Sequence, residues 1–416
     1  MTASVGSEPL EALELRRSLV ADLHARPAPR LRAPATVAFA AFLPAAGAAG
    51  RDRAHDREIA EQVEAEVSVE EHHEFASFTA VVPGAQDTLF DPARVPLTPE
   101  WAAAVGGPRA VAVLVEVVPM PADDAAVVAL AKQHLDSTDL LISQVQEQQI
   151  TVATDFRIDG QGCLRFLVMA SPEMGPGRTG RVVRRLIEIE TYRALSMLTL
   201  ESAGTIGSRL GELEPRLLDL AERIDDESHS TEDTLHELLR VSAQLEELAS
   251  RHDFRFAAAR AYEAIVADRL AALGETRFGG RQLLREFLAL RYTPAMRTVA
   301  STERRLARVI ERAGRAGDLL RARVDVARSA QNAQLLESLD RRSEAQLRLQ
   351  HAVEGLSVVA VSYYAVGLLG YVLAPVAHWA DIDKEYLQAA AIPVVLLFVW
   401  LGVRRVRHGL HGPTRS

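Results

Sequence analysis

Two short motifs in this 416-residue chain contain residue types that bind metal ions or phosphates. The first is EEHHE at residues 70–74, and histidine and carboxylate side chains are common zinc ligands. The motif lies inside a run, residues 67–82, that is expected to form one strand. Neighbouring side chains on a strand point to opposite faces, so a shared ligand set is disfavoured. A solvated strand end is the simpler interpretation of EEHHE.

The second motif is GPGRTG at residues 175–180, with the Gly-x-Gly-x-x-Gly spacing that lets a backbone approach a pyrophosphate at a helix N-terminus. The helix predicted after it leads to no second parallel strand, so a turn that opens a helix is favoured. The single cysteine, Cys163, lies in an apolar strand, where packing is its expected role. No Walker-type loop, His-Glu-x-x-His or Gly-x-Ser-x-Gly motif is present. We therefore expect no enzymatic activity, no cofactor, no metal site and no nucleic-acid binding.

Residues 1–175 are predicted to form a cytoplasmic α/β domain with a mixed sheet. Runs of β-branched and apolar residues indicate strands, and helical spacing of apolar residues indicates helices. Asp159-Gly160 is a typical hairpin turn. The expected elements are a helix at 10–24, strands at 35–43, 67–82 and 109–118, helices at 51–66 and 122–135, and two strands within 149–171.

Residues 176–354 are predicted to be a helical region that ends in a long membrane-proximal helix, continuous from about Pro294. Some 60 residues of helix would extend ~90 Å, and a helix of that length needs partners, so helical packing or self-association is expected. Residues 211–250 carry 12 acidic and 3 basic side chains, whereas residues 281–350 carry 15 arginines and 8 acidic residues. These charges are either solvated helix faces or the contact surfaces of acidic and basic helices that pack together.

Two apolar segments near the C-terminus, within residues 355–408, predict a transmembrane helix pair. No full charge occurs between Glu354 and Asp381, a run of 26 residues, or between Glu385 and Arg404, a run of 18. A membrane-crossing helix needs about 20 apolar residues. The alternative is a helical hairpin buried in a soluble core. No signal-peptide-like run is found at the N-terminus, so we expect the rest of the chain to stay in the cytoplasm.

Basic residues lie before the first apolar segment and after the second, at the two outer ends of the pair. The loop between the segments is acidic, and cytoplasmic flanks of membrane helices are enriched in arginine and lysine. This pattern predicts a hairpin in the inner membrane with both termini in the cytoplasm, in contact with membrane lipids. Its orientation is set by the residues that follow the second segment, Arg404, Arg405 and Arg407.

One face of the first segment carries small and hydroxyl-bearing side chains at helical spacings of three and four. In lipid such residues turn toward protein or water, so the face is predicted to line either a packing seam between helices or a water-filled pore. Its members are Ser357, Ala360, Tyr364, Gly367 and Tyr371.

Several stretches together resemble a bacterial family of uncharacterised membrane-anchored proteins, classed as a domain of unknown function. The most specific is QNAQLLESLDRRSEAQLRLQHAVEGLSVVAVSYYAVGLLGY (331–371), joined by LHARP (23–27), TDFRIDGQG (154–162), EIETYRALSML (188–198) and RYTPAMRT (291–298). The resemblance covers nearly the whole chain. It implies a membrane protein but brings no known activity and no catalytic residues.

The order of domains is similar to that of the CorA-type metal-ion transporters, which are homo-oligomers whose first span lines the pore. LSVVAV (356–361) is similar to the start of that first span. CorA proteins carry Gly-Met-Asn at its outer end, where this chain reads LLGYVLAPVAHW, so magnesium transport does not carry over. We therefore expect a membrane-anchored homo-oligomer with an interaction or regulatory role toward an unidentified protein partner. The alternative is a CorA-like ion channel or transporter that lacks this motif.

Overall fold

The computed structural model describes residues 28–45, 52–62, 65–84, 88–91, 95, 97–136, 138, 140–224, 229–380 and 384–410. The chain forms two compact units, Met1–Asp318 and Leu319–Ser416. The boundary predicted at residue 175 coincides with the start of helix α5 at Pro176, whereas the one predicted at residue 354 falls inside helix α7. The helix predicted at residues 10–24 lies outside the described residues.

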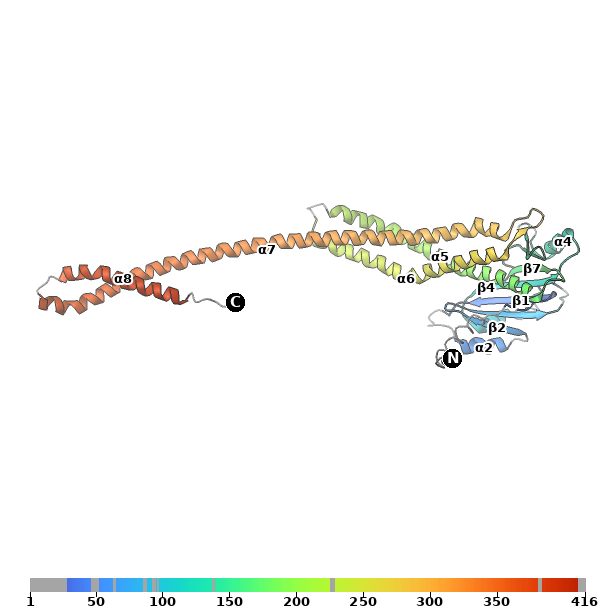
Figure 1. Ribbon diagram of the computed structural model, residues 1–416, viewed down its shortest axis with the longest axis horizontal. Coiled ribbons are helices and arrows are strands. Elements are labelled where there is room, and N and C mark those ends of the chain that lie inside the picture. Colours follow the sequence, from blue (N-terminus) through green and yellow to red (C-terminus); the bar gives the residue numbers. More distant parts are fainter. Residues whose placement is uncertain are drawn as a thin grey trace, which may run out of the picture. The chain divides into compact units, whose positions relative to one another are not determined.

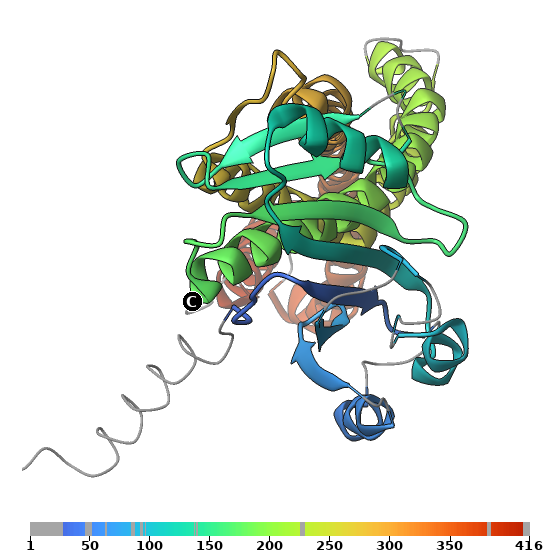
Figure 2. The same ribbon diagram turned by 90° about the vertical axis from the view of Figure 1, so that its right-hand side faces the viewer.

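One eight-stranded mixed sheet organises the first unit, as the sequence predicts (Figures 1 and 2). Its strand order is β2-β3-β1-β4-β7-β6-β5-β8. Strands β4 and β7 pair in parallel, and the other neighbours pair antiparallel. The strands are β1 (Ala35–Phe42), β2 (Glu66–Glu71), β3 (Ala76–Pro83), β4 (Arg109–Pro119), β5 (Leu141–Val145), β6 (Ile150–Thr154), β7 (Leu164–Ala170) and β8 (Thr276–Arg277).

The single strand predicted at 67–82 is wrong, because this run is a hairpin of β2 and β3 with His72 and His73 in the turn. The His72 backbone N–H donates to the Phe75 carbonyl at 2.9 Å, which closes the turn. An uninterrupted β-type composition hid this reversal, since the turn contains neither glycine nor proline. Strands β5 and β8 and a short helix after residue 98 were not predicted either.

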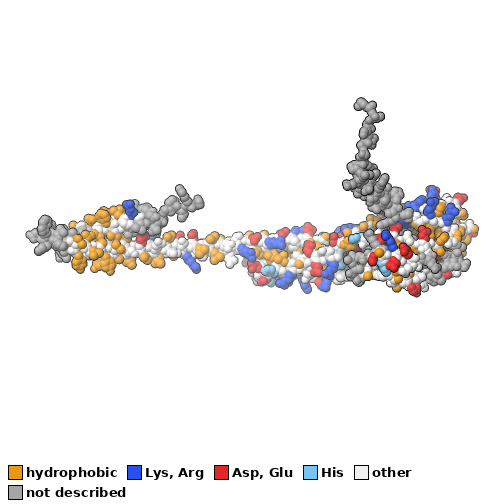
Figure 3. Space-filling view, turned by 90° about the horizontal axis from the view of Figure 1, so that it is seen from below, with side chains coloured by type: hydrophobic (Ala, Val, Ile, Leu, Met, Phe, Trp, Pro, Cys, Tyr) orange, Lys and Arg blue, Asp and Glu red, His pale blue; other side chains and the backbone are white. Residues whose placement is uncertain are grey.

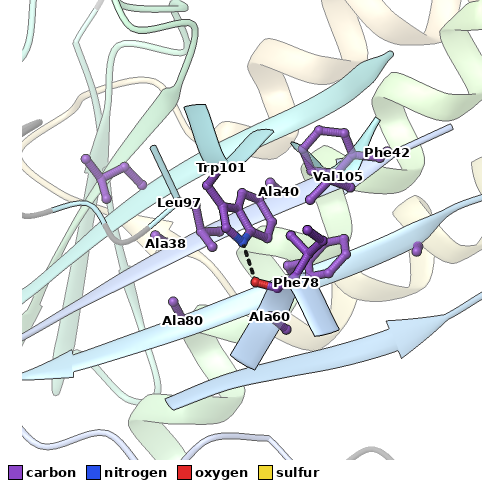
Figure 4. Packing of buried hydrophobic residues seen from close by; sticks show 12 residues of the cluster. Ala38, Ala40, Phe42, Ala60, Phe78, Ala80, Leu97, Trp101 and Val105 are labelled. Carbon is purple, nitrogen blue, oxygen red and sulfur yellow. Dashed lines mark hydrogen bonds between the residues drawn. The ribbon is translucent and has the colours of Figure 1, made fainter. Parts of the chain in front are cut away.

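Three helices cover one face of the sheet: α2 (Arg53–Glu61), α3 (Pro99–Val105) and α4 (Asp124–His134). α2 is shorter than the helix predicted at 51–66 and begins directly after its capping residue, Asp52, which accepts hydrogen bonds from two backbone N–H groups. Beneath α2 and α3 the sheet contributes small and aromatic side chains that surround Trp101 (Figure 4). The cluster includes Ala38, Ala40, Phe42, Ile59, Ala60, Phe78, Ala80, Leu97 and Val105.

The opposite face is covered by α5 (Pro176–Arg223), which packs against α6 (Thr231–Leu273) and is hydrogen-bonded to the first part of α7 (Leu284–Ala380). Buried leucines recur on α5 at spacings of three and four, which places them on one face. Arg305 of α7 donates two hydrogen bonds to the Glu214 carboxylate of α5, at 3.0 and 2.7 Å. The pair lowers the pKa of Glu214. Acidic and basic helices therefore do meet, at this partly buried pair.

Helix α7 begins ten residues earlier than predicted and runs through Pro294. Its start is fixed by Glu275, whose buried carboxylate accepts backbone N–H bonds from Leu284 at 3.2 Å and Arg285 at 3.0 Å. The same carboxylate accepts a bond from the Ser143 hydroxyl of β5 at 2.7 Å. A negative group at a helix N-terminus is favourable, so Glu275 links the sheet edge to α7.

The second unit contains the rest of α7 and α8 (Lys384–Leu410). Among the described residues, one helix, α7, is long and apolar enough to cross a membrane, and only 6% of its apolar stretch is buried. This exposure argues against a core helix of a soluble domain. A shorter apolar stretch, Ile392–Gly402, lies in α8. Figure 3 shows hydrophobic side chains gathered over the described apolar parts of α7 and α8.

A buried carboxylate at the centre of the sheet gives a pH-dependent prediction. Glu116 of β4 is 2% exposed, and burial raises its pKa against the opposing effect of bonds from the Thr36 hydroxyl (2.8 Å) and the Phe90 N–H (3.0 Å). Because the folded-state pKa lies above the unfolded value, native Glu116 holds its proton more tightly. Its contribution to stability is therefore present at low pH and is lost as pH rises through the folded pKa.

Glu116→Gln keeps an acceptor for Phe90 and a partner for Thr36, and it removes the buried charge. We expect this variant to be more stable than the wild type at pH 7 and to lose that advantage at pH 4. Urea denaturation at the two pH values measures the difference. An equal loss of stability at both pH values would contradict the raised pKa of Glu116.

Candidate functional site

A pocket of about 630 Å³ lies between the α5 side of the sheet and the helices that cover it. Its floor is formed by β1, β2 and β3, one wall by α5, and one edge by the segment that precedes β1. The floor side chains are Phe39, Glu66, Ser68, Glu70, Ser77, Thr79 and Val81, and the remaining lining residues are Ala28, Pro29, Arg30, His72, Phe75, Arg184, Ile187, Glu188, Thr191, Tyr192 and Arg269.

The floor is polar because strand β2 alternates. Glu66, Ser68 and Glu70 point into the pocket, while Val67 and Val69 pack on the α2–α3 side. The paired strand β3 adds Ser77 and Thr79, opposite Glu70 and Ser68. The Ser77 hydroxyl donates to the Glu70 carbonyl at 3.4 Å, and the Ser68 hydroxyl donates to the Thr79 carbonyl at 3.5 Å. Apolar side chains would have closed this space against α5, whereas these carboxylates and hydroxyls give the pocket a polar floor. The alternation is visible in the sequence, but it reads equally well as a solvent-exposed face.

The helix wall carries a chain of ion pairs. Arg184 donates to Glu188 at 2.9 Å and lies 3.5 Å from a carboxylate oxygen of Glu70, which ties the wall to the floor. Arg269 of α6 donates to the second oxygen of Glu188. Glu188 thus holds two guanidinium groups in position at the pocket wall. Partly buried, hydrogen-bonded pairs of this kind fix side-chain positions more firmly than exposed pairs do.

The β2–β3 turn is attached to α6 beside the pocket. Glu74 is buried and accepts hydrogen bonds from Arg255 at 2.8 Å and from the Tyr262 hydroxyl. Burial, together with the bond to Glu74, raises the pKa of Tyr262 well above its usual range. The His72 ring stacks on Phe75, with ring centroids 4.0 Å apart, and His73 packs edge-on against Phe254 of α6. The EEHHE residues therefore position the turn.

The GPGRTG motif lies against the segment before β1, which contributes Pro29 to the pocket lining. Gly175 precedes the first turn of α5, and the Leu31 N–H donates to the Pro176 carbonyl at 3.0 Å. A side chain at Gly180 would clash with the Pro29 carbonyl oxygen, 1.6 Å from an added Cβ. The glycine thus lets the segment before β1 cross close to α5. After α5 the chain continues into α6, so the motif opens a helix and belongs to no dinucleotide-binding βαβ unit.

In the parts of the chain that the structure describes, no group of three or more His, Cys, Asp or Glu side chains is placed to hold a metal ion. Cys163 is half-buried against the α2–α3 cluster, and burial raises the pKa of its thiol. A raised thiol pKa makes it a weak nucleophile at neutral pH. The arrangement of side chains in the pocket is suited to binding a ligand through its charges and hydroxyls.

Three of the stretches that carry the family resemblance meet next to the end of strand β6. Phe156 follows β6 and packs on Phe287 of α7, with ring centroids 5.2 Å apart. The Arg193 guanidinium of α5 lies over the Phe156 ring and donates two bonds of 2.7 Å to Glu190. One turn further, Ser196 shares a 2.9 Å hydrogen bond with the Tyr292 hydroxyl. These stretches join the sheet, α5 and α7.

The small and hydroxyl-bearing residues predicted for the first apolar segment all lie on α7 and are exposed in the single chain: Ser357, Ala360, Tyr364, Gly367 and Tyr371. The buried or half-buried positions among residues 355–372 lie on the other side of α7, at Val358, Ser362, Ala365, Val366, Leu369 and Gly370, and Val395 of α8 is also buried. We infer that this other side packs on α8. The three arginines predicted to set topology, Arg404, Arg405 and Arg407, lie in the last turns of α8, where Arg405 is exposed.

Comparison with known proteins confirms the uncharacterised family expected from the sequence. No curated protein matches the chain. One family profile, described as "Protein of unknown function (DUF3422)", matches residues 11–410, nearly the whole chain. The protein therefore belongs to the DUF3422 family.

Proposed function

We propose that this protein is a homo-oligomer anchored in the bacterial inner membrane by α7 and α8, with a cytoplasmic domain that acts by binding and regulation. The observation that carries the proposal is the exposure of α7. From Asp325 to Val353 every residue of the helix is exposed, including Leu335, Leu336 and Leu347. A single helix with leucines open to water on several sides is unstable alone and calls for partners.

One line of exposed residues runs along this helix. Successive residues are rotated by about 100° around a helix axis, so four apolar side chains before Ser357 and the five small and hydroxyl-bearing positions share one arc of about 80°. We call the set the α7 stripe: Leu335, Leu339, Leu349, Val353, Ser357, Ala360, Tyr364, Gly367 and Tyr371. Arg342 and Gln346 interrupt it. A second copy of the chain offers the same stripe, and ion pairs within the helix, such as Glu337–Arg341, leave the flanks nearly neutral.

Membrane topology tests the anchor directly. Arginines after the second apolar stretch favour a cytoplasmic C-terminus. Reporter fusions after Ser416 should read as cytoplasmic, and fusions between residues 381 and 385 should read as external. A chain recovered in the soluble fraction, or a cytoplasmic reading from both fusions, would disprove the anchored hairpin.

An ion pathway of the CorA type is the second candidate function, and the outward position of the α7 stripe favours it. In a closed ring of copies, a helix face turned away from α8 is available to surround a central pore. The hydroxyls of Ser357, Tyr364 and Tyr371 would then stay hydrated. The absent Gly-Met-Asn motif leaves the transported ion unspecified.

Cysteine labelling separates the pore from a packing seam. With Cys163 replaced by serine, cysteines at positions 357, 364 and 371 should react with a small water-soluble thiol reagent if they line a pore, because reagent and thiolate need water. Val359→Cys is a matched control, since Val359 is 65% exposed but points away from the stripe toward the predicted lipid. Val358→Cys tests the α8 side. Protection at all five positions would rule out a pore and leave the anchor.

A further inference from the structure

Two opposite charges in the pocket beneath α5 are not neutralised by other residues. Arg30 precedes β1 and Glu66 begins β2, and both line the pocket and are exposed. In the described part of the chain neither side chain forms an ion pair with the other or with a third residue. A cation and an anion that share one cavity without pairing are available to a ligand.

The other charges of the pocket are already matched. Glu188 holds Arg184 and Arg269, and Glu70 lies 3.5 Å from Arg184 and 3.9 Å from His72. A ligand in this cavity therefore meets little net charge and two charged side chains, Arg30 and Glu66, that are not paired. Apolar surface is present as well, from Phe39, Phe75 and Ile187.

We propose that the pocket binds a small zwitterion of the amino-acid or dipeptide class. Its carboxylate would pair with Arg30 and its ammonium group with Glu66, since guanidinium groups suit carboxylates and carboxylates suit ammonium ions. The volume of about 630 Å³ is within the 300–1,000 Å³ range of small-molecule sites. The hydroxyls of Ser68 and Thr79 offer hydrogen bonds to a peptide group. This inference does not depend on membrane anchoring.

Calorimetric titration of the full-length protein in detergent tests the proposal with three matched probes. They are alanyl-phenylalanine, its N-acetyl form without the cation, and its C-terminal amide without the anion. The free dipeptide should bind, and each blocked form should bind at least about tenfold more weakly, a difference of about 1.4 kcal/mol. Absence of binding by the free dipeptide, or equal binding of all three probes, would overturn the proposal.

Charge-neutralising variants test whether Arg30 binds the carboxylate of the dipeptide and Glu66 its ammonium group. The free dipeptide should bind the Arg30→Gln variant as weakly as the amide binds the wild type. It should bind the Glu66→Gln variant as weakly as the N-acetyl form binds the wild type. Arg32→Gln and Glu61→Gln are matched controls, because both residues are exposed and lie outside the pocket lining. Identical losses in the controls and in the pocket variants would count against the site. Thermal unfolding of each variant checks that the exposed substitutions leave the fold intact.

Discussion

Replacement of Trp101 by alanine should lower the free energy of unfolding of the N-terminal domain by about 3–5 kcal/mol, the usual cost of removing a buried aromatic side chain. Trp101 of α3 is 8% exposed and packs edge-on against Phe78 and Phe42, with ring centroids 4.8 and 5.8 Å away (Figure 4). Its indole N–H donates to the Ile59 carbonyl of α2 at 3.1 Å. The substitution therefore leaves a cavity and removes one of the two donors to the Ile59 carbonyl, which keeps the Gln62 N–H at 3.3 Å.

Pulse proteolysis in urea measures this loss on the full-length protein without relying on tryptophan fluorescence. Trp101→Phe is the matched control, because it keeps an aromatic ring against Phe78 and loses mainly the hydrogen bond, worth about 0.5–1.5 kcal/mol. An unchanged urea midpoint for Trp101→Ala would show that α2 and α3 contribute little to the stability of the sheet.

Replacement of Leu335 by lysine should break the detergent-solubilised protein into smaller species. Leu335 belongs to the α7 stripe and is 56% exposed in the single chain. If copies assemble through the stripe, each loses a leucine whose burial contributes about 1.5–3 kcal/mol and gains a charge that has no partner there. The effect repeats in every subunit of a symmetric assembly. Light scattering coupled to size exclusion gives the mass.

Leu347→Lys is the control for this experiment. Leu347 has nearly the same exposure, 53%, but lies more than 100° around the helix from Leu335. We expect it to leave the mass of the assembly unchanged. Loss of assembly in both variants would show that a different face holds the copies together, and an oligomer that survives Leu335→Lys would remove the stripe as the interface.

Periodicity alone predicted the strongly patterned elements. The strands at 35–43 and 109–118 and the helix at 122–135 were predicted within a few residues, because long runs of one period have few competing interpretations. The hairpin around Asp159-Gly160 was predicted from its turn residues, and strands β6 and β7 pair antiparallel. The hairpin at 67–82 was missed because a turn made of His72, His73 and Glu74 contains no residue that breaks a strand pattern.

The amino-acid sequence by itself determined the mixed α/β domain, the predominantly helical character of the chain after Gly175, the apolar stretch of α7 and the family, but not the short strand β8 within that helical part. Each depends on local composition and spacing, which a chain carries along its length. Only the tertiary structure decided that Arg30, Glu66 and Arg269 line one pocket, since they are separated by up to 239 positions and come from different elements. It also decided that the small and hydroxyl-bearing face of α7 is exposed in the single chain, while Ser362 on the other side is buried. Spacing places residues on one face of a helix, but only packing decides which face is covered.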